Sequence, residues 1–258
     1  MSTERWLPRS IVVEFCGLPG AGKTWLSSAV EQEWDGLVSR PTRRIAPDVP
    51  AGRRLSRKLG LVAAEATRRP LLEARVAHRI ARSGQPGAGE AAKRWVQWAS
   101  TQSLMGRARR APGVHVFDEG VLQALWSLAL RGDPSATLRV LRDSTGRWSA
   151  PDLVILLDPP VDLLVRRLRD RASEHSRLQR LADDVELRAE LVRGRSLLER
   201  LVAWWEETSR IEGSVARIVG ERHDAAAVIV AIDAAIHRVG AEPSAFSSEG
   251  KGTSAGRT

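Results

Sequence analysis

Apolar residues are grouped in two ways along the chain. Short aliphatic runs that end at glycines, acids or prolines are typical of buried strands. They lie at 11–18, 35–42, 113–120, 150–160 and within 214–224. Apolar positions at helical spacing lie between them, at 24–34, 52–82, 90–110, 121–132, 161–171, 183–210 and 225–239. This alternation predicts an α/β fold, a doubly wound parallel sheet of about five strands with helices on both faces.

One domain is expected to span residues 1–240. The chain has 258 residues, of which 43% are hydrophobic, so it can bury a sizeable core. Residues 40–112 are expected to form a helical region, interrupted by the loop SGQPGAGE (83–90). The Ser- and Gly-rich end of the chain, 241–258, is expected to be disordered.

The segment IVVEFCGLPGAGKTWLSSAV (11–30) joins the first predicted strand to the first predicted helix. Within it, Gly17 to Thr24 fit the phosphate-loop pattern G-x-x-x-x-G-K-[ST] in the structural context that the pattern requires. The glycines let backbone N–H groups surround an anion, Lys23 binds the β- and γ-phosphates, and the Thr24 hydroxyl is a ligand for Mg²⁺. We therefore predict ATP and Mg²⁺ as cofactors. The predicted nucleotide contacts are Gly17, Pro19, Gly20, Ala21, Gly22, Lys23, Thr24 and Trp25.

Two acids follow the third predicted strand. Asp118 and Glu119 come directly after VHVF, and the carboxyl ends of parallel strands are where ligands bind in such sheets. Asp118 is the candidate ligand of Mg²⁺, and Glu119 is the candidate base that accepts a proton from an attacking hydroxyl. These roles could be exchanged, and either acid could instead cap the helix that starts near Gly120.

Positive charge is concentrated in one part of the chain. Residues 40–110 hold 17 Lys and Arg but four acids, whereas the whole chain has a net charge of +9. Such a segment suits an acidic ligand, a nucleic acid or an anionic surface. The alternative is that these side chains are solvated on outer helix faces.

A second arginine-rich segment, VRRLRDRASEHSRLQRL (165–181), follows the fourth predicted strand. Arginines can neutralise the charge that phosphoryl transfer spreads over the equatorial oxygens. The candidates for this role are Arg167, Arg171 and Arg177. The alternative is that they form surface ion pairs with acids of the same segment.

Residues 10–238 as a whole resemble the nucleoside and nucleotide kinases that carry a phosphate loop, particularly thymidylate-kinase-like chains. The resemblance is carried by GLPGAGKT (17–24), SRPTRR (39–44), PDLVILLDPPVDLLVRRLRDR (151–171) and HSRLQRL (175–181). It implies transfer of the γ-phosphoryl group of ATP, with Arg167, Arg171 and Arg177 in a lid of about 166–182. It also implies acceptor binding by Arg43 and Arg44. Members of that group are often homodimers, so KRWVQWAS (93–100) is a candidate for either an interface or the core.

One position departs from that family. Thymidylate kinases typically have Asp-Arg after the third strand, and this chain has Asp118-Glu119. An acid at the second position suits a hydroxyl acceptor, which must lose a proton, whereas the basic segment suits an anionic acceptor. The acceptor class therefore stays open between a nucleoside, a nucleotide and a sugar or metabolite hydroxyl.

The motifs favour a small-molecule acceptor over a nucleic acid as the partner. The alternative functions are a nucleic-acid-associated or regulatory NTPase, and a protein that binds nucleotide for structural reasons. The chain has one cysteine, no apolar signal segment near its start and no apolar run of the ~18 residues that a membrane span needs. We therefore expect a cytoplasmic protein with no membrane partner.

Overall fold

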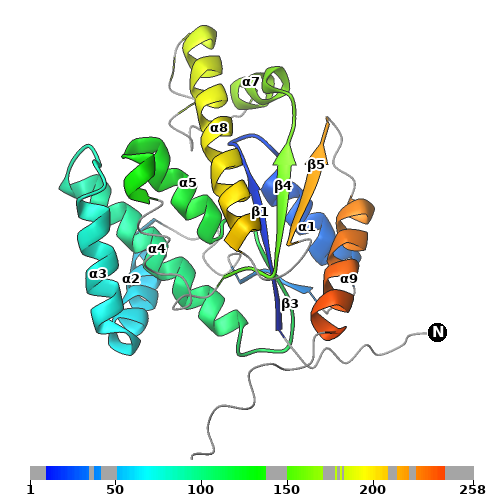
Figure 1. The fold of residues 1–258 in the computed structure, drawn as a ribbon, viewed down its shortest axis with the longest axis horizontal. Coiled ribbons are helices and arrows are strands. Elements are labelled where there is room, and N and C mark those ends of the chain that lie inside the picture. The colour runs from blue at the N-terminus through cyan, green and yellow to red at the C-terminus, as the bar shows by residue number, and fades with distance from the viewer. Residues whose placement is uncertain are drawn as a thin grey trace, which may run out of the picture.

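Five parallel strands form a single sheet in the order β2-β3-β1-β4-β5 (Figure 1). The computed structural model describes residues 10–34, 38–41, 51–137, 150–170, 178, 181, 183–208, 214–220 and 225–241. The strands are β1 (Ser10–Gly17), β2 (Val38–Ser39), β3 (Gly113–Phe117), β4 (Leu153–Asp158) and β5 (Val215–Val219). All five predicted strands are therefore confirmed. β1 is as long as the apolar run that predicted it, and the other four strands are shorter than theirs.

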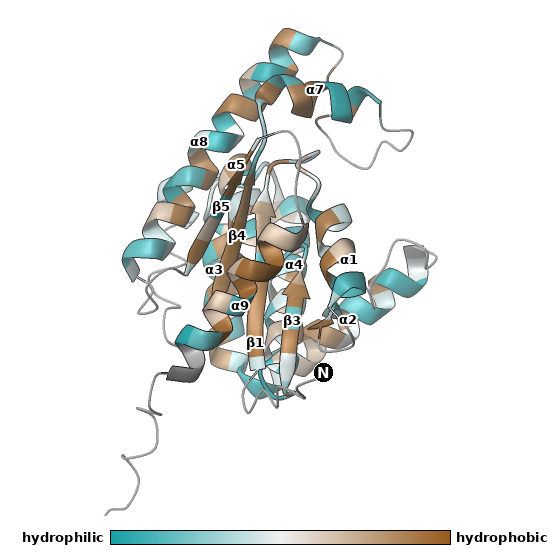
Figure 2. Cartoon of the chain, turned by 90° about the vertical axis from the view of Figure 1, so that its right-hand side faces the viewer, coloured by the Kyte–Doolittle hydropathy of each residue, from teal (hydrophilic) through white to brown (hydrophobic). Residues whose placement is uncertain are grey.

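The apolar composition of the three inner strands explains why they are buried. β1, β3 and β4 are buried along almost their whole length, because both of their faces carry aliphatic or aromatic side chains. The edge strands are different, since β5 is half-exposed and β2 has two residues. Figure 2 shows the strands in the brown of apolar residues, with helices around them.

Helices cover both faces of the sheet, as the alternation of elements predicted. Those that the structure describes are α1 (Lys23–Glu33), α2 (Ala51–Arg68), α3 (Pro70–Ala81), α4 (Ala88–Ala108), α5 (Val121–Arg131), α7 (Val161–Arg169), α8 (Asp184–Thr208) and α9 (Ala225–Ala241). α1 and α9 pack together on one face, whereas α4, α5 and α8 cover the other (Figure 1). The doubly wound α/β fold is confirmed.

The helical region between β2 and β3 differs from its prediction at two points, the first being that α4 begins at Ala88, inside the predicted loop 83–90. Apolar spacing predicted one helical stretch over 52–82, but α2 ends at Arg68 and α3 begins at Pro70. Pro70 has no N–H to continue α2, and its fixed φ suits the first position of a new helix. α2 and α3 both pack against α4, on the side of the molecule away from α9 (Figure 1).

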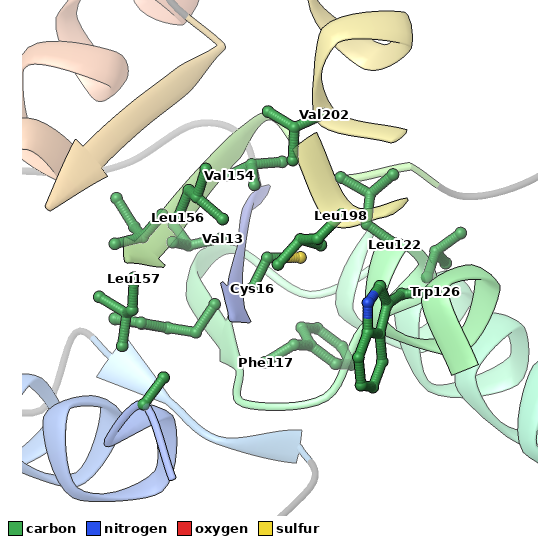
Figure 3. Packing of buried hydrophobic residues seen from close by; sticks show 14 of the residues in the cluster. Val13, Cys16, Phe117, Leu122, Trp126, Val154, Leu156, Leu157, Leu198 and Val202 are labelled. Atoms are coloured by element: carbon green, nitrogen blue, oxygen red, sulfur yellow. The ribbon is translucent and has the colours of Figure 1, made fainter. Parts of the chain in front are cut away.

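A single hydrophobic core joins the sheet to α5 and α8. Figure 3 shows part of this core, including Cys16, Phe117, Trp126, Leu156 and Leu198. The Trp126 indole N–H donates a 2.7 Å hydrogen bond to the backbone carbonyl of Gly194, which ties α5 to α8. On α4, Trp98 is 3% exposed and belongs to the same core, so at least this tryptophan of KRWVQWAS is a core residue.

The carboxylate of Glu14 joins β1 to the first turn of α5. Glu14 is fully buried, and its oxygens accept hydrogen bonds from the backbone N–H groups of Val121 (2.8 Å) and Gln123 (2.9 Å). These N–H groups have no partner inside the helix, and the helix dipole favours a negative charge there. Gly120 makes room for the interaction, because a Cβ at this position would collide with the Glu14 carboxyl group.

We expect Gly120→Ala to lower the free energy of unfolding by about 3 kcal/mol, because the added methyl group must displace the Glu14 carboxyl from its two backbone donors. Gly60→Ala is the matched control, since a Cβ at Gly60 in α2 meets no neighbouring atom within 4 Å. The control should be neutral or slightly stabilising, because alanine favours a helix. Urea unfolding of both variants tests this expectation, and equal stabilities would contradict it.

Candidate functional site

A cavity of about 520 Å³ opens at the carboxyl ends of the inner strands. One wall is the phosphate loop between β1 and α1, and another is the pair of acids after β3. The remaining walls come from α4, α5, α8 and two residues that precede α8. Its lining consists of residues 19–25, Arg94, Gln97, Asp118, Glu119, Gln123, Trp126, Ser127, Leu130, Arg131, Leu178, Leu181, Glu186, Glu190 and Arg193.

The phosphate loop has a backbone that only glycine adopts easily. Gly20 and Gly22 have φ values of 86° and 95°, in the left-handed region. Gly22 is the N-cap of α1 and no side chain caps this helix, so its first turn is available to an anion. The Lys23 ammonium group donates to the carbonyls of Gly17 (2.7 Å) and Leu18 (3.2 Å), which holds it over the loop.

Of the predicted nucleotide contacts, seven line the cavity and one lies behind it. Residues 19–25 are in the lining, and Trp25 is 62% exposed at this surface. Gly17 instead ends β1, where a Cβ would lie 2.8 Å from the Leu157 carbonyl oxygen. Its N–H donates to the Gln123 side-chain oxygen at 3.4 Å, so the start of the loop is tied to α5.

The Thr24 hydroxyl and the Asp118 carboxylate lie together at the base of the cavity. Thr24 Oγ1 donates to Asp118 Oδ2 at 3.3 Å, and the Arg40 guanidinium lies at the same distance from that oxygen. Arg40 is 7% exposed and also contacts Ser28 and Glu31. Asp118 is therefore held beside the phosphate loop.

The side-chain oxygens of Thr24 and Asp118 suit Mg²⁺. They do not suit a metal whose ligands all come from the protein. Magnesium prefers hard oxygen ligands and takes most of them from phosphates and water. Thr24 and Asp118 supply two such oxygens at the loop. Within the described parts of the chain there is no cluster of three or more His, Cys, Asp or Glu that could hold a metal alone.

Glu119 differs from Asp118 in its surroundings. It is exposed, lines the cavity, and forms no hydrogen bond or ion pair with the described part of the chain. The N-cap residue of α5 is Gly120, which has no side chain to cap the helix. The Glu14 carboxylate accepts the hydrogen bonds of the first turn instead. Capping is therefore supplied by a residue of β1 rather than by either acid after β3.

Of the three arginines predicted to lie in a lid, one is in the described part of the chain. Arg167 lies on α7 and donates to the backbone carbonyl of Gly20 at 3.3 Å, so it lies against the phosphate loop. Leu178 and Leu181, from the same predicted lid, line the cavity. The other predicted arginines, in the lid and near β2, lie outside the described residues: Arg171, Arg177, Arg43 and Arg44.

Several site residues were missed by the sequence analysis. Arg40 has the clearest signal, since it is the first residue after β2 and thus lies at the carboxyl edge of the sheet. Glu14 is a charged residue inside an apolar strand, which is costly unless it is paired. Gln123, Arg94 and Arg131 carry no signal in the sequence, because only the packing of α4 and α5 brings them to the cavity.

The basic segment lies mostly on the outside of the molecule. Among the described residues of 51–110, Arg94 lines the cavity beside the phosphate loop. Nine others are exposed on α2, α3 and α4 or directly beside the ends of these helices: Arg53, Arg57, Arg68, Arg69, Arg75, Arg82, Lys93, Arg107 and Arg110. The exposed positions agree with the interpretation that much of this charge is solvated.

Comparison with known structures returns nucleoside and nucleotide kinases, the group that the sequence resembles. The deoxyadenosine kinase from M. mycoides with bound dATP is 12% identical, with a TM-score of 0.43, over 89% of this chain and 100% of that chain. The thymidylate kinase from Candida albicans is 12% identical, with a TM-score of 0.47, over 90% of this chain and 93% of that chain. No protein-family model and no curated protein sequence matches.

These likenesses are too low to carry a function, which must come from the residues of this chain. The described residues include no helix that is both long enough and apolar enough to cross a membrane.

Burial raises the pKa of Glu14 to about 7, against an ordinary value of 4.5. The backbone N–H groups of α5 and the Cys16 thiol, which donates to Oε1 at 3.3 Å, favour the charged form and oppose the shift. Because the folded protein holds this proton more tightly than the unfolded chain does, the contribution of Glu14 to stability is greatest below pH 4.5 and falls as the pH rises towards 7.

We expect the Glu14 carboxyl to contribute a loss of unfolding free energy on the order of 3 kcal/mol between pH 4.5 and 7. Glu14→Gln should remove this part of the pH dependence, because the amide does not titrate. It should also destabilise the protein at all pH values, since one backbone donor then faces an NH₂ group. Glu33→Gln, an exposed change on α1, controls for the loss of one negative charge. Chemical unfolding across this pH range measures the slopes, and equal slopes in the wild type and Glu14→Gln would contradict the assignment.

Proposed function

We propose that this protein transfers the γ-phosphoryl group of ATP to a hydroxyl group of a small-molecule acceptor. The observation that carries the proposal is the position of Glu119, an exposed carboxylate without a partner in the described chain, in the same cavity as the phosphate loop. A carboxylate with no competing hydrogen bond is available to accept a proton from a substrate.

The bond changes follow from this arrangement. The acceptor hydroxyl oxygen attacks the γ-phosphorus and forms a new P–O bond, while the bond to the β,γ-bridging oxygen breaks. ADP leaves with that electron pair, and the hydroxyl proton passes to the Glu119 carboxylate. Mg²⁺, when bound, neutralises charge on the β- and γ-phosphates, and Thr24 and Asp118 are the residues that would hold it.

The other residues position and neutralise the transferred group. Lys23 brings its ammonium group from the loop carbonyls to the phosphates, where negative charge accumulates in the transition state. Arg40 orients Asp118 through their ion pair. Arg167 supports the loop through the Gly20 carbonyl. Arg171 and Arg177 in the lid, and Arg43 and Arg44 at the acceptor, keep the roles that the sequence predicted.

We expect ADP release that depends on both Mg²⁺ and an acceptor, measured across nucleosides, nucleoside monophosphates, sugars and aminoglycoside-like metabolites. Lys23→Ala should reduce turnover by about 10²- to 10³-fold, because it removes a positive charge that the transition state needs. ADP release that needs no acceptor, or that needs a nucleic acid, would favour the NTPase alternative. Nucleotide binding without turnover would favour a structural role of the nucleotide.

Glu119→Gln should reduce kcat by about 10²- to 10⁴-fold with a hydroxyl acceptor, because the amide accepts no proton. The KM for ATP should change little, since Glu119 is assigned to the acceptor side. Steady-state kinetics with the acceptor found in the panel measure both constants. Glu186→Gln, another exposed acid of the cavity lining, tests whether the effect belongs to Glu119 alone. A kcat close to that of the wild type in Glu119→Gln would remove the base from the proposal.

A further inference from the structure

One face of α5 runs along the cavity from the phosphate loop to a pair of arginines. Its lining residues recur at helical spacing: Gln123, Trp126, Ser127, Leu130 and Arg131. α5 has 11 residues, which corresponds to a length of roughly 16 Å. Glu119 lies just before the first turn of this helix and Arg131 is its last residue, so the cavity has two chemically different ends.

The far end of the cavity is rich in donors that lack acceptors. Arg131 is half-buried and forms no hydrogen bond or ion pair with the described residues. Arg94 donates from Nη1 to the Gln97 side-chain oxygen at 3.1 Å, but its Nε is buried without a partner. A buried guanidinium nitrogen without an acceptor is costly, and such a cost is removed when an anion binds.

The charges at this end do not balance. Glu90 is the acid nearest to Arg94, with its Oε2 3.5 Å from Nη2, and it is already hydrogen-bonded to Lys93 at 2.8 Å. Three cations, Lys93, Arg94 and Arg131, therefore lie around this one carboxylate. Arg193, which contacts the Leu130 carbonyl, is paired with Glu190 at 2.7 Å, so this pair leaves the excess unchanged. Burial lowers the pKa of Arg94, and the neighbouring positive charge of Arg131 lowers it further, while Glu90 opposes the shift. The local excess of positive charge favours an anionic ligand.

We propose that Arg94 and Arg131 bind an anionic oxygen group of the acceptor, a phosphate or a carboxylate, at the end of the cavity opposite Glu119. The acceptor is then a hydroxyl compound that carries a second, negatively charged group. The proposal rests on the proposed function for the place of the reactive hydroxyl. In the sequence, Glu119 suits a hydroxyl acceptor and the basic segment suits an anionic one. The proposal accounts for both, because Glu119 takes the proton and Arg94 of the basic segment binds the anion.

The dipole of α5 by itself favours a cation at Arg131, because its last carbonyls carry partial negative charge. Arg94 is not explained in this way, since it is the seventh of the 21 residues of α4 and lies far from the last turn, where a dipole favours a cation. A purely structural role of the pair would change stability without distinguishing between acceptors. The test therefore compares acceptors that differ by one anionic group.

Two sets of matched acceptors are used. In the first, neutral glucose is compared with glucose 6-phosphate and glucuronate, and in the second, neutral thymidine is compared with thymidine 3′-monophosphate. With the wild type, we expect the anionic members to have the lower KM, and the phosphate and carboxylate arms identify which group the site prefers. Arg131→Gln and Arg94→Gln should each raise the KM for an anionic member by about tenfold or more, with little change in kcat or in the KM for the neutral member. Arg131→Lys should recover part of the loss.

Arg75→Gln is the matched control, because it removes the same charge from an exposed position on α3 outside the cavity lining. It should leave every KM unchanged. The proposal is overturned if neutral and anionic members have equal KM values in the wild type, or if the arginine variants raise both equally. In either case the kinase function would stand.

Binding separates the two proposals. In the wild type with Mg²⁺ and ADP present, so that the phosphate loop is filled, calorimetric titration should show that glucose 6-phosphate or thymidine 3′-monophosphate binds more tightly than its neutral partner. Arg131→Gln should abolish the difference. If this difference is found but no acceptor is phosphorylated, the kinase proposal fails and the anion site stands. If Arg131→Gln leaves the anionic probes bound as tightly as before, the anion site is overturned.

Discussion

The carboxylate of Glu14 is the interaction on which the geometry of the site depends. It lies inside the central strand and accepts two hydrogen bonds from the first turn of α5. Gly120 leaves the space that it occupies. The same strand continues into the phosphate loop, and the same helix begins directly after the two acids. Burying a carboxyl group is costly, and the backbone donors offset that cost only while β1 and α5 keep this position.

Around this anchor, the two acids after β3 have different surroundings although they are neighbours in sequence. Asp118 is bound by Thr24 and Arg40, which keeps its charge close to the phosphate loop. Glu119 stands exposed in the cavity with no partner among the described residues. A residue that orients an ion must be held, whereas a residue that accepts a proton must be free to meet its substrate. The structure thus supports the assignment that the sequence had left open.

The sequence predicted the parts of the fold that depend on local pattern. The strands, most of the helices and the phosphate loop followed from apolar runs, helical spacing and one glycine-rich motif, because each is encoded by residues close together in the chain. The helix over 52–82 was wrong in one detail, although Pro70 carried the signal for its break. The predicted acceptor residues Arg43 and Arg44 lie outside the described residues, and the anion site proposed above was not predicted. Arg94 and Arg131 are 37 positions apart in the sequence, and nothing in the sequence distinguishes them from the many other arginines.

By itself, the sequence determined that this chain forms a parallel α/β sheet, with a loop of the phosphate-binding pattern and acids at the same edge. Strand order, the pairing of Arg40 with Asp118, the capping of α5 by Glu14 and the two-ended cavity were decided by the tertiary structure alone. The physical reason is the range of the interactions. Backbone preferences and amphipathic spacing act over a few residues, whereas charge, burial and hydrogen bonding depend on which distant segments the packed core brings together.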